Sequence, residues 1–187
     1  MSEIDDKKRY WLWGELDAVS HEMLKKIQLS VNKKLEGPTF DLHLTLSGPF
    51  YDISQDRLNR IESFSIKNKQ LSIKSSSYQA KDLFFQSLFI EIEKSKELTD
   101  LKNQLDHQLG LESELFYPHI SLFYGLEEQE KKQLVIDHLP TINEPLILDK
   151  ISIVEIGEGV ESWKILYQYP LIKDLYAFKT IGIGRPI

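Results

Sequence analysis

Two histidines in this sequence begin the same short pattern. His43 opens His-Leu-Thr-Leu, and His119 opens His-Ile-Ser-Leu. On a β-strand, the first and third residues of such a pattern point to one face and the second and fourth to the other. Each copy therefore predicts an imidazole beside a hydroxyl, which is Thr45 in the first copy and Ser121 in the second. Two such strands facing each other would gather two proton-transfer groups and two hydrogen-bond donors, which suits acid–base chemistry on a phosphate.

The plainer alternative is two ordinary strand histidines held by local hydrogen bonds. The order of the predicted elements argues against it, because strand, helix and motif strand follow one another at 10–46 and again at 84–124. We interpret this order as a degenerate internal duplication with a pseudo-two-fold relation. Each half would then supply one motif to a shared cleft.

The remaining histidines give no comparable signal. His21, His107 and His138 fall on predicted helices with charged faces, where side chains are usually solvated. No two histidines are four residues apart, the spacing that places two metal ligands on one helix. The sequence therefore predicts no metal site.

Apolar periodicity and turn residues predict the elements that must position the two motifs. Ser20 is the expected N-cap of the first helix, which Gly37-Pro38 should end, and Ser95 is the expected N-cap of the third, which Gly110 should end. The motifs fall on strands at 40–46 and 116–124. The other predicted strands are 10–14, 71–80, 84–92, 146–156 and 163–171, and the predicted helices are 20–35, 56–64, 95–109 and 127–139.

Length and composition indicate one domain. The chain has 187 residues, of which 41% are hydrophobic and 28% charged, enough for a full core. We expect a flexible N-terminus at 1–8, a bilobal domain at 9–172 and a C-terminal tail at 173–187. Cysteine is absent, which excludes disulfides and a thiol nucleophile and fits a cytoplasmic protein. The polar start is unlike a signal peptide, and no apolar run suits a membrane span.

The formal net charge of −6 bears on partners. It is unsuited to duplex DNA, which is bound through many cationic contacts. A small anionic substrate remains possible, since a pocket can be locally rich in donors. We expect a monomer with a small cyclic phosphate or a short oligonucleotide as its substrate.

The duplicated pattern resembles the two-histidine (2H) phosphoesterase superfamily, marked by a repeated His-x-Thr/Ser-x motif, and is most similar to its cyclic phosphodiesterase branch. The likeness spans 10–171. The first strand carries Trp13 where the branch carries a tryptophan. A proline often precedes the first-motif histidine in the branch; here Leu42 stands at that place, whereas Pro118 does precede His119. The charged helix after Gly125 and the late segment 161–164 also look like the family's pattern.

This resemblance implies an α+β, bilobal 2H phosphoesterase-like fold, with two antiparallel sheets forming a central cleft and helices on the outside. It also implies a catalytic set, two substrate-binding aromatic residues, and no metal or organic cofactor. Strand alternation from Ser121 points Tyr124 away from the catalytic face, unless the strand ends or bulges near Phe123. Trp163 is expected to be structural. The catalytic set is His43, Thr45, His119 and Ser121, and the substrate-binding residues are Trp13 and Tyr124.

Three functions stay open. The first is metal-independent opening of a nucleoside 2′,3′-cyclic phosphate or ADP-ribose 1″,2″-cyclic phosphate, in which one histidine deprotonates water and the other protonates the leaving oxygen. The second is a phosphodiesterase for 2′,5′-linked or cyclic oligonucleotides, in RNA processing or antiviral signalling. The third is a nucleotide-binding module without turnover. The near-symmetry of the motifs leaves the proton roles open, with a lean to His119 as base and His43 as acid.

Overall fold

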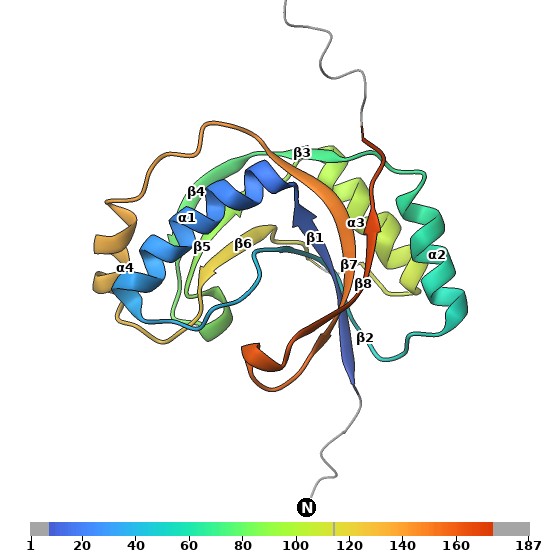
Figure 1. Cartoon of the computed structure of the whole chain (residues 1–187), viewed down its shortest axis with the longest axis horizontal. Coiled ribbons are helices and arrows are strands. Elements are labelled where there is room, and N and C mark those ends of the chain that lie inside the picture. Colours follow the sequence, from blue (N-terminus) through green and yellow to red (C-terminus); the bar gives the residue numbers. More distant parts are fainter. Residues whose placement is uncertain (1–7, 114, 174–187) are drawn as a thin grey trace, which may run out of the picture.

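The computed structural model describes residues 8–113 and 115–173 (Figure 1). Nearly all of the expected flexible N-terminus and C-terminal tail therefore lies outside the described residues. The described part contains β1 (Arg9–Leu16), α1 (Ala18–Leu35), β2 (Leu44–Phe50), α2 (Gln55–Ser65), β3 (Leu71–Ile73), β4 (Ser75–Ala80), η1 (Phe84–Gln86), β5 (Leu88–Ile92), α3 (Lys96–Leu109), β6 (His119–Phe123), α4 (Gln129–Ile136), β7 (Leu146–Ile156), η2 (Val160–Ser162) and β8 (Lys164–Pro170).

One antiparallel, strongly curved sheet forms the centre of the fold. Its strand order is β3-β7-β1-β2-β6-β5-β4, and β8 pairs with β7 beside this path. The α+β fold and its duplication are confirmed: β1-α1-β2 and β5-α3-β6 repeat the same order, and their motif strands lie next to each other. The two expected sheets are halves of one continuous sheet. They meet where Leu44 of β2 is aligned with Ile120 of β6.

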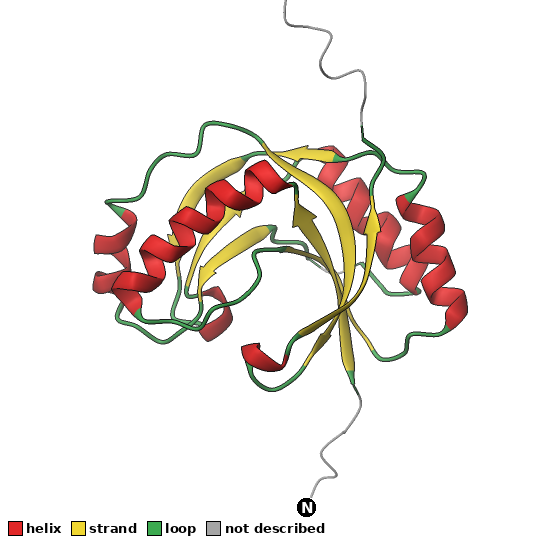
Figure 2. Cartoon of the chain, in the orientation of Figure 1, coloured by secondary structure: helices red, strands yellow, loops and turns green. Residues whose placement is uncertain are grey.

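The helices join the two halves by crossed packing. The helix α1 follows β1 in the chain but packs against β6, while α3 follows β5 but packs against β2. As Figure 2 shows, α1 and α4 lie toward one end of the molecule, and α2 and α3 lie toward the other. The apolar residues between the histidine and hydroxyl of each motif, Leu44 and Ile120, are fully buried in the main core. The helix-covered face of the sheet thus anchors both motifs.

The ends of two helices show how local chemistry sets the elements. The N-cap of α1 is Asp17 and not Ser20, because the Asp17 carboxylate accepts a hydrogen bond from the Ser20 N–H at 2.8 Å. The hydroxyl of Ser20 instead accepts from the N–H of Ile147 at 3.0 Å, so it ties α1 to β7. The predictions for α3 are confirmed: Ser95 is its N-cap, and Gly110 takes the left-handed conformation after its end.

Three predicted strands differ from the structure in ways that matter for the site. The first motif strand begins at Leu44, so His43 stands one residue before it. The second is shorter than expected and runs from His119 to Phe123. The segment predicted as the start of one strand at 84–92 contains the short helix η1, and β5 starts only at Leu88. Both motif histidines therefore stand at or just before the first residue of their strands.

None of the helices in residues 8–113 and 115–173 combines the length and apolar character required for a transmembrane span.

Candidate active site

The pairing of the two motif strands brings their four polar side chains together. Because Leu44 is aligned with Ile120 in an antiparallel pair, His43 falls opposite Ser121 and Thr45 falls opposite His119. All four polar side chains leave the sheet on the face opposite the buried pair, and all four line one cavity of about 400 Å³. The structure therefore unites the residues that the sequence singled out, each histidine lying across from the hydroxyl of the other motif.

Both imidazoles are held in the same way by the main chain. The Nδ1 of His43 lies 2.7 Å from the carbonyl oxygen of Asp41, and the Nδ1 of His119 lies 2.9 Å from that of Tyr117. A carbonyl oxygen only accepts, so Nδ1 carries the proton and donates it in each case. The other ring nitrogen, Nε2, is then left in each neutral imidazole with a free lone pair. Each histidine can thus take up or return a proton at Nε2.

The electrostatic surroundings of the two histidines differ. His43 is buried, and burial lowers its pKa to about 4, with the nearby His119 charge adding to the effect. The pKa of His119 is also lowered, mainly by burial, and further by the charge of Lys81. His119 is nevertheless partly exposed. Near neutral pH, His43 is therefore the histidine that is more firmly held in its neutral form.

Trp13 lies directly against the first histidine. Its indole stacks on the His43 ring with 3.5 Å between centroids and 5° between planes. The side chain is buried although it lines the cavity, and it is aligned with Thr45 across β1 and β2. One face of the indole is therefore occupied by the imidazole. The indole thus covers one face of the His43 ring.

Tyr124 reaches the cavity because its strand ends one residue earlier. It follows the last residue of β6, so strict alternation no longer applies to it. Its ring stacks on Phe40 at 3.9 Å, and its side chain lines the cavity next to the motif residues. Burial raises the pKa of Tyr124 to about 12, so its hydroxyl is protonated and available as a donor near neutral pH.

The structure adds wall residues that sequence reasoning missed or judged structural. Trp163 lines the cavity and packs edge-on against Trp13 at 5.7 Å. Phe85, about half exposed, faces Trp163 with 5.8 Å between ring centroids, and Arg9 brings a positive charge to the same cavity. Arg9 could have been found from strand alternation, because Arg9, Trp11 and Trp13 are at every second position of β1 and all line the cavity. Nothing in the pattern around Phe85 distinguished it from a core aromatic residue.

A second cavity of about 360 Å³ adjoins the first. Four residues line both of them, namely Trp11, Thr45, Gln86 and His119. The first cavity carries the aromatic residues Trp13, Phe85, Tyr124 and Trp163 beside the motif residues. The second carries Ser47 and the buried Lys102–Asp106 ion pair. The site is therefore open on both sides of the Thr45–His119 region.

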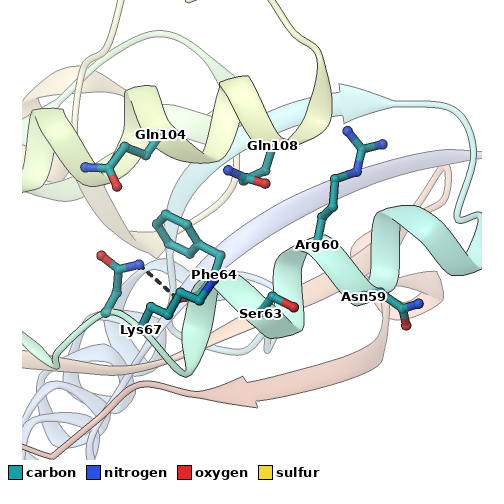
Figure 3. Close-up of a pocket in the computed structure, with 8 residues that line it drawn as sticks. Asn59, Arg60, Ser63, Phe64, Lys67, Gln104 and Gln108 are labelled. Carbon is teal, nitrogen blue, oxygen red and sulfur yellow. Dashed lines mark hydrogen bonds between the residues drawn. The ribbon is translucent and has the colours of Figure 1, made fainter.

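A further hollow between α2 and α3 shares no residue with these cavities. Figure 3 shows the amide and cationic side chains around it, among them Asn59, Arg60, Lys67 and Gln104. None of the motif residues lines it. It is thus a separate feature of the α2–α3 surface.

Comparison with solved structures identifies the class to which this fold belongs. The chain is similar to LigT from E. coli (TM-score 0.58, 15% identity, covering 89% of this chain and 98% of that one). It is also similar to TT0787 of Thermus thermophilus (TM-score 0.56, 14% identity, 89% and 99%) and to a structure described as a phosphoesterase (TM-score 0.52, 15% identity, 89% and 99%).

These similarities confirm, for the fold, the resemblance drawn from the sequence: the chain has the fold of the 2H phosphoesterases. The likeness extends over almost the whole length of the solved proteins. No protein-family model matches the sequence, and a search of the curated proteins finds no match either.

Proposed function

We propose that this protein is a metal-independent phosphodiesterase that opens cyclic phosphates, such as nucleoside 2′,3′-cyclic phosphates or ADP-ribose 1″,2″-cyclic phosphate. One observation carries the proposal. Two imidazoles, each with Nδ1 donating to a main-chain carbonyl, share a cavity with two hydroxyls of the opposite motif. A pure binding module has no need for two such proton carriers.

The reaction is a hydrolysis in which each histidine moves one proton. Nε2 of the neutral histidine takes a proton from water as the water oxygen bonds to phosphorus. The bond from phosphorus to the sugar oxygen breaks, and the leaving alkoxide receives the proton from Nε2 of the second, protonated histidine. Thr45 and Ser121 donate to the non-bridging oxygens, where negative charge increases in the transition state.

The burial of His43 supports an assignment opposite to the lean from the sequence. With a pKa lowered to about 4, His43 is neutral and suited to be the base. His119 is less enclosed, and a bound phosphate anion would favour its protonated form. We therefore assign His43 as the base and His119 as the acid. Trp13, stacked on His43, then positions the base.

The aromatic wall supports a substrate with a flat ring. Phe85 and Trp163 are both partly exposed at the cavity, and Tyr124 adds a protonated hydroxyl to its lining. Such rings stack on a nucleobase or an adenine dinucleotide with little sequence preference. The solved complex of LigT with 3′-AMP is consistent with a nucleotide in a site of this fold.

A second candidate substrate is a short 2′,5′-linked oligonucleotide. The observation that favours it is the adjoining cavity, which shares Thr45, Gln86 and His119 with the first. A phosphorus held at this junction leaves room for one group on each side.

The test is a metal-free panel assay. The protein is incubated with EDTA and cyclic mononucleotides, ADP-ribose cyclic phosphate or 2′,5′-oligoadenylate, and the products are identified by mass. We expect one water to be added per phosphodiester bond, with no loss on chelation. Activity that EDTA abolishes contradicts the metal-independent mechanism, and tight binding without any product favours the binding module.

A further inference from the structure

Gln86 lies where the two cavities meet. It is the last residue of η1, and its side chain lines both cavities together with Thr45 and His119. These shared residues border the place where a phosphate would sit between the groups on its two sides. The amide of Gln86 thus belongs to the same wall as one hydroxyl and one histidine of the motifs.

A lysine fixes which way this amide points. The Nζ of Lys81 lies 3.2 Å from the Oε1 of Gln86. An ammonium group only donates hydrogen bonds, so the oxygen of the amide must face Lys81, and the NH₂ group must point away from it. Among residues 8–113 and 115–173, no hydrogen bond uses the Nε2 of Gln86. The amide therefore has two N–H donors that its surroundings leave for a ligand.

Lys81 is itself held in place and stays outside the cavities. Its ammonium lies over the ring of Tyr117, 4.2 Å from the centroid, and 5.3 Å from that of Phe89. It lines neither cavity. Lys81 would thus act on a bound phosphate indirectly, by orienting the Gln86 amide and by lowering the pKa of His119.

The turn that carries both side chains is anchored from several sides. Lys132 of α4, whose side chain is completely buried, donates from Nζ to the carbonyl of Lys81 at 2.7 Å. On the other side of Gln86, the hydroxyl of Ser121 donates to the carbonyl of Phe85 at 3.3 Å. A side chain on so constrained a backbone keeps its orientation before a ligand arrives, which is what a catalytic hydrogen-bond donor requires.

We propose that Gln86 is a further substrate-contacting residue, whose amide, oriented by Lys81, donates a hydrogen bond to a non-bridging oxygen of the reacting phosphate. The inference rests on the proposed function, because it takes the phosphate to lie between the two motifs. Lys81 is a positioning residue in this arrangement. Gln86 adds a third donor to those of Thr45 and Ser121, and it carries no charge of its own.

Two substitutions of Gln86 test the donor directly, measured on the best substrate of the panel. Gln86→Leu removes the amide, and we expect kcat/KM to fall about 10- to 100-fold, as when one hydrogen bond to a charged group is lost. Gln86→Glu keeps a partner for Lys81 but presents an acceptor to the phosphate, so we expect a larger fall than for Gln86→Leu. A purely structural role of Gln86 predicts the reverse order, since the glutamate preserves the contact with Lys81.

Substitutions of Lys81 separate its two effects. Lys81→Arg keeps a cationic donor, and we expect it to retain more activity than Lys81→Met. Lys81→Met also removes the positive charge that lowers the pKa of His119, so the limb of the pH profile that reports His119 should move to higher pH. In Gln86→Leu that limb should stay in place. The other titratable and charged groups around His119 remain in both variants. They are His43, Glu91 (aligned with His119 across β5 and β6), Arg9 and Glu158 of the first cavity, and Lys102, Asp106 and Glu112 of the second.

The outcomes distinguish this proposal from the proposed function. Suppose that His43→Ala abolishes activity but Gln86→Leu has the kcat/KM of the wild type. That result overturns the role of Gln86 and leaves the proposed phosphodiesterase activity supported. If the wild-type protein hydrolyses no substrate of the panel, the proposed phosphodiesterase function itself is contradicted. Thermal unfolding of each variant checks that a loss of activity is not a loss of fold.

Discussion

The two copies of the motif share their backbone chemistry but not their surroundings. In both, Nδ1 donates to the carbonyl two residues upstream, and Nε2 is left for the cavity. His43 is buried and stacked on Trp13, whereas His119 is partly exposed and lies near Phe89, Tyr117 and the positive charge of Lys81. The two motif histidines thus have the same main-chain hydrogen bond but different neighbouring side chains.

This difference is the physical basis of the acid and base roles that we propose. Two titratable groups take opposite roles when their environments favour opposite protonation states. Nothing within the two four-residue motifs distinguishes them, since each pairs a histidine with a hydroxyl. The distinction comes from Trp13 on β1 and Lys81 in the turn after β4, which lie in opposite halves of the sheet.

The largest expected effect is the loss of either histidine. His43→Ala and His119→Ala should each lower kcat about 10²- to 10⁴-fold, the usual contribution of one positioned proton carrier. Steady-state kinetics on the best panel substrate measures this. The exposed histidines His107 and His138 provide matched controls, and their alanine variants should keep wild-type kinetics. Full activity in either motif variant contradicts the two-histidine mechanism.

The pH profile should tell the two histidines apart. For wild type we expect a bell-shaped kcat/KM, with the acidic limb near the His43 pKa of about 4 and the basic limb below 6.5, because the pKa of His119 is lowered from that value. His43→Ala should lose the acidic limb, and His119→Ala the basic one. If His119→Ala instead loses the acidic limb and His43→Ala the basic limb, His119 is the base and His43 the acid.

Loss of a hydroxyl should have a smaller effect. Thr45→Val and Ser121→Ala should each lower kcat/KM about 10- to 100-fold, as expected for one hydrogen bond to a charged group. The loss should be smaller for Ser121, because its hydroxyl already donates to the Phe85 carbonyl and must leave that acceptor to reach a phosphate. Thr45→Ser, which keeps the hydroxyl, is the control. Equal falls in kcat/KM for Thr45→Val and Ser121→Ala would contradict the expected difference between the two hydroxyls.

Stability should also depend on the buried histidine. The unfolded chain protonates His43 near pH 6.5, whereas the folded protein does so only at about pH 4. The unfolded state therefore binds more protons between these values, and the free energy of unfolding should fall with decreasing pH by up to about 3 kcal/mol. Urea unfolding at pH 7 and pH 4.5 measures it. His43→Asn should flatten this dependence more than His119→Asn does.

The smallest expected effect is that of the ring stacked on His43. Trp13→Leu admits water to the imidazole, which raises the pKa of His43, so the acidic limb should move to higher pH. Trp13→Phe keeps an aromatic face and should move it less. An acidic limb that stays in place in Trp13→Leu would mean that other neighbours keep His43 dry.

The sequence predicted the parts of this site that depend on periodicity. Alternation placed each histidine beside its hydroxyl, and the repeated element order indicated the duplication, because both follow from regular backbone geometry. Ser95 and Gly110 marked the ends of α3 for the same reason. The strand at 146–156 also matches β7 over its whole length.

The rest required contacts between distant residues. The stacking of Trp13 on His43 depends on the pairing of β1 with β2, and the bond from Lys81 to Gln86 depends on a 3-10 helix where a strand was predicted. The N-cap of α1 is Asp17 and not Ser20, whose hydroxyl bonds to the distant strand β7. Irregular turns and tertiary partners carry no period, so a single sequence could not reveal them.

The crossed packing of the helices has a consequence for how the site can be reached. A cleft between two independent lobes can open and close by a hinge motion. Here α1 packs against β6 and α3 packs against β2, so each helix links the two halves of the sheet. Parting the halves would strip each helix from its strand and expose the core around Leu44 and Ile120. We therefore expect substrate to enter a preformed site by local rotation of rim side chains such as Phe85. Neither half, expressed alone, should reach a native state.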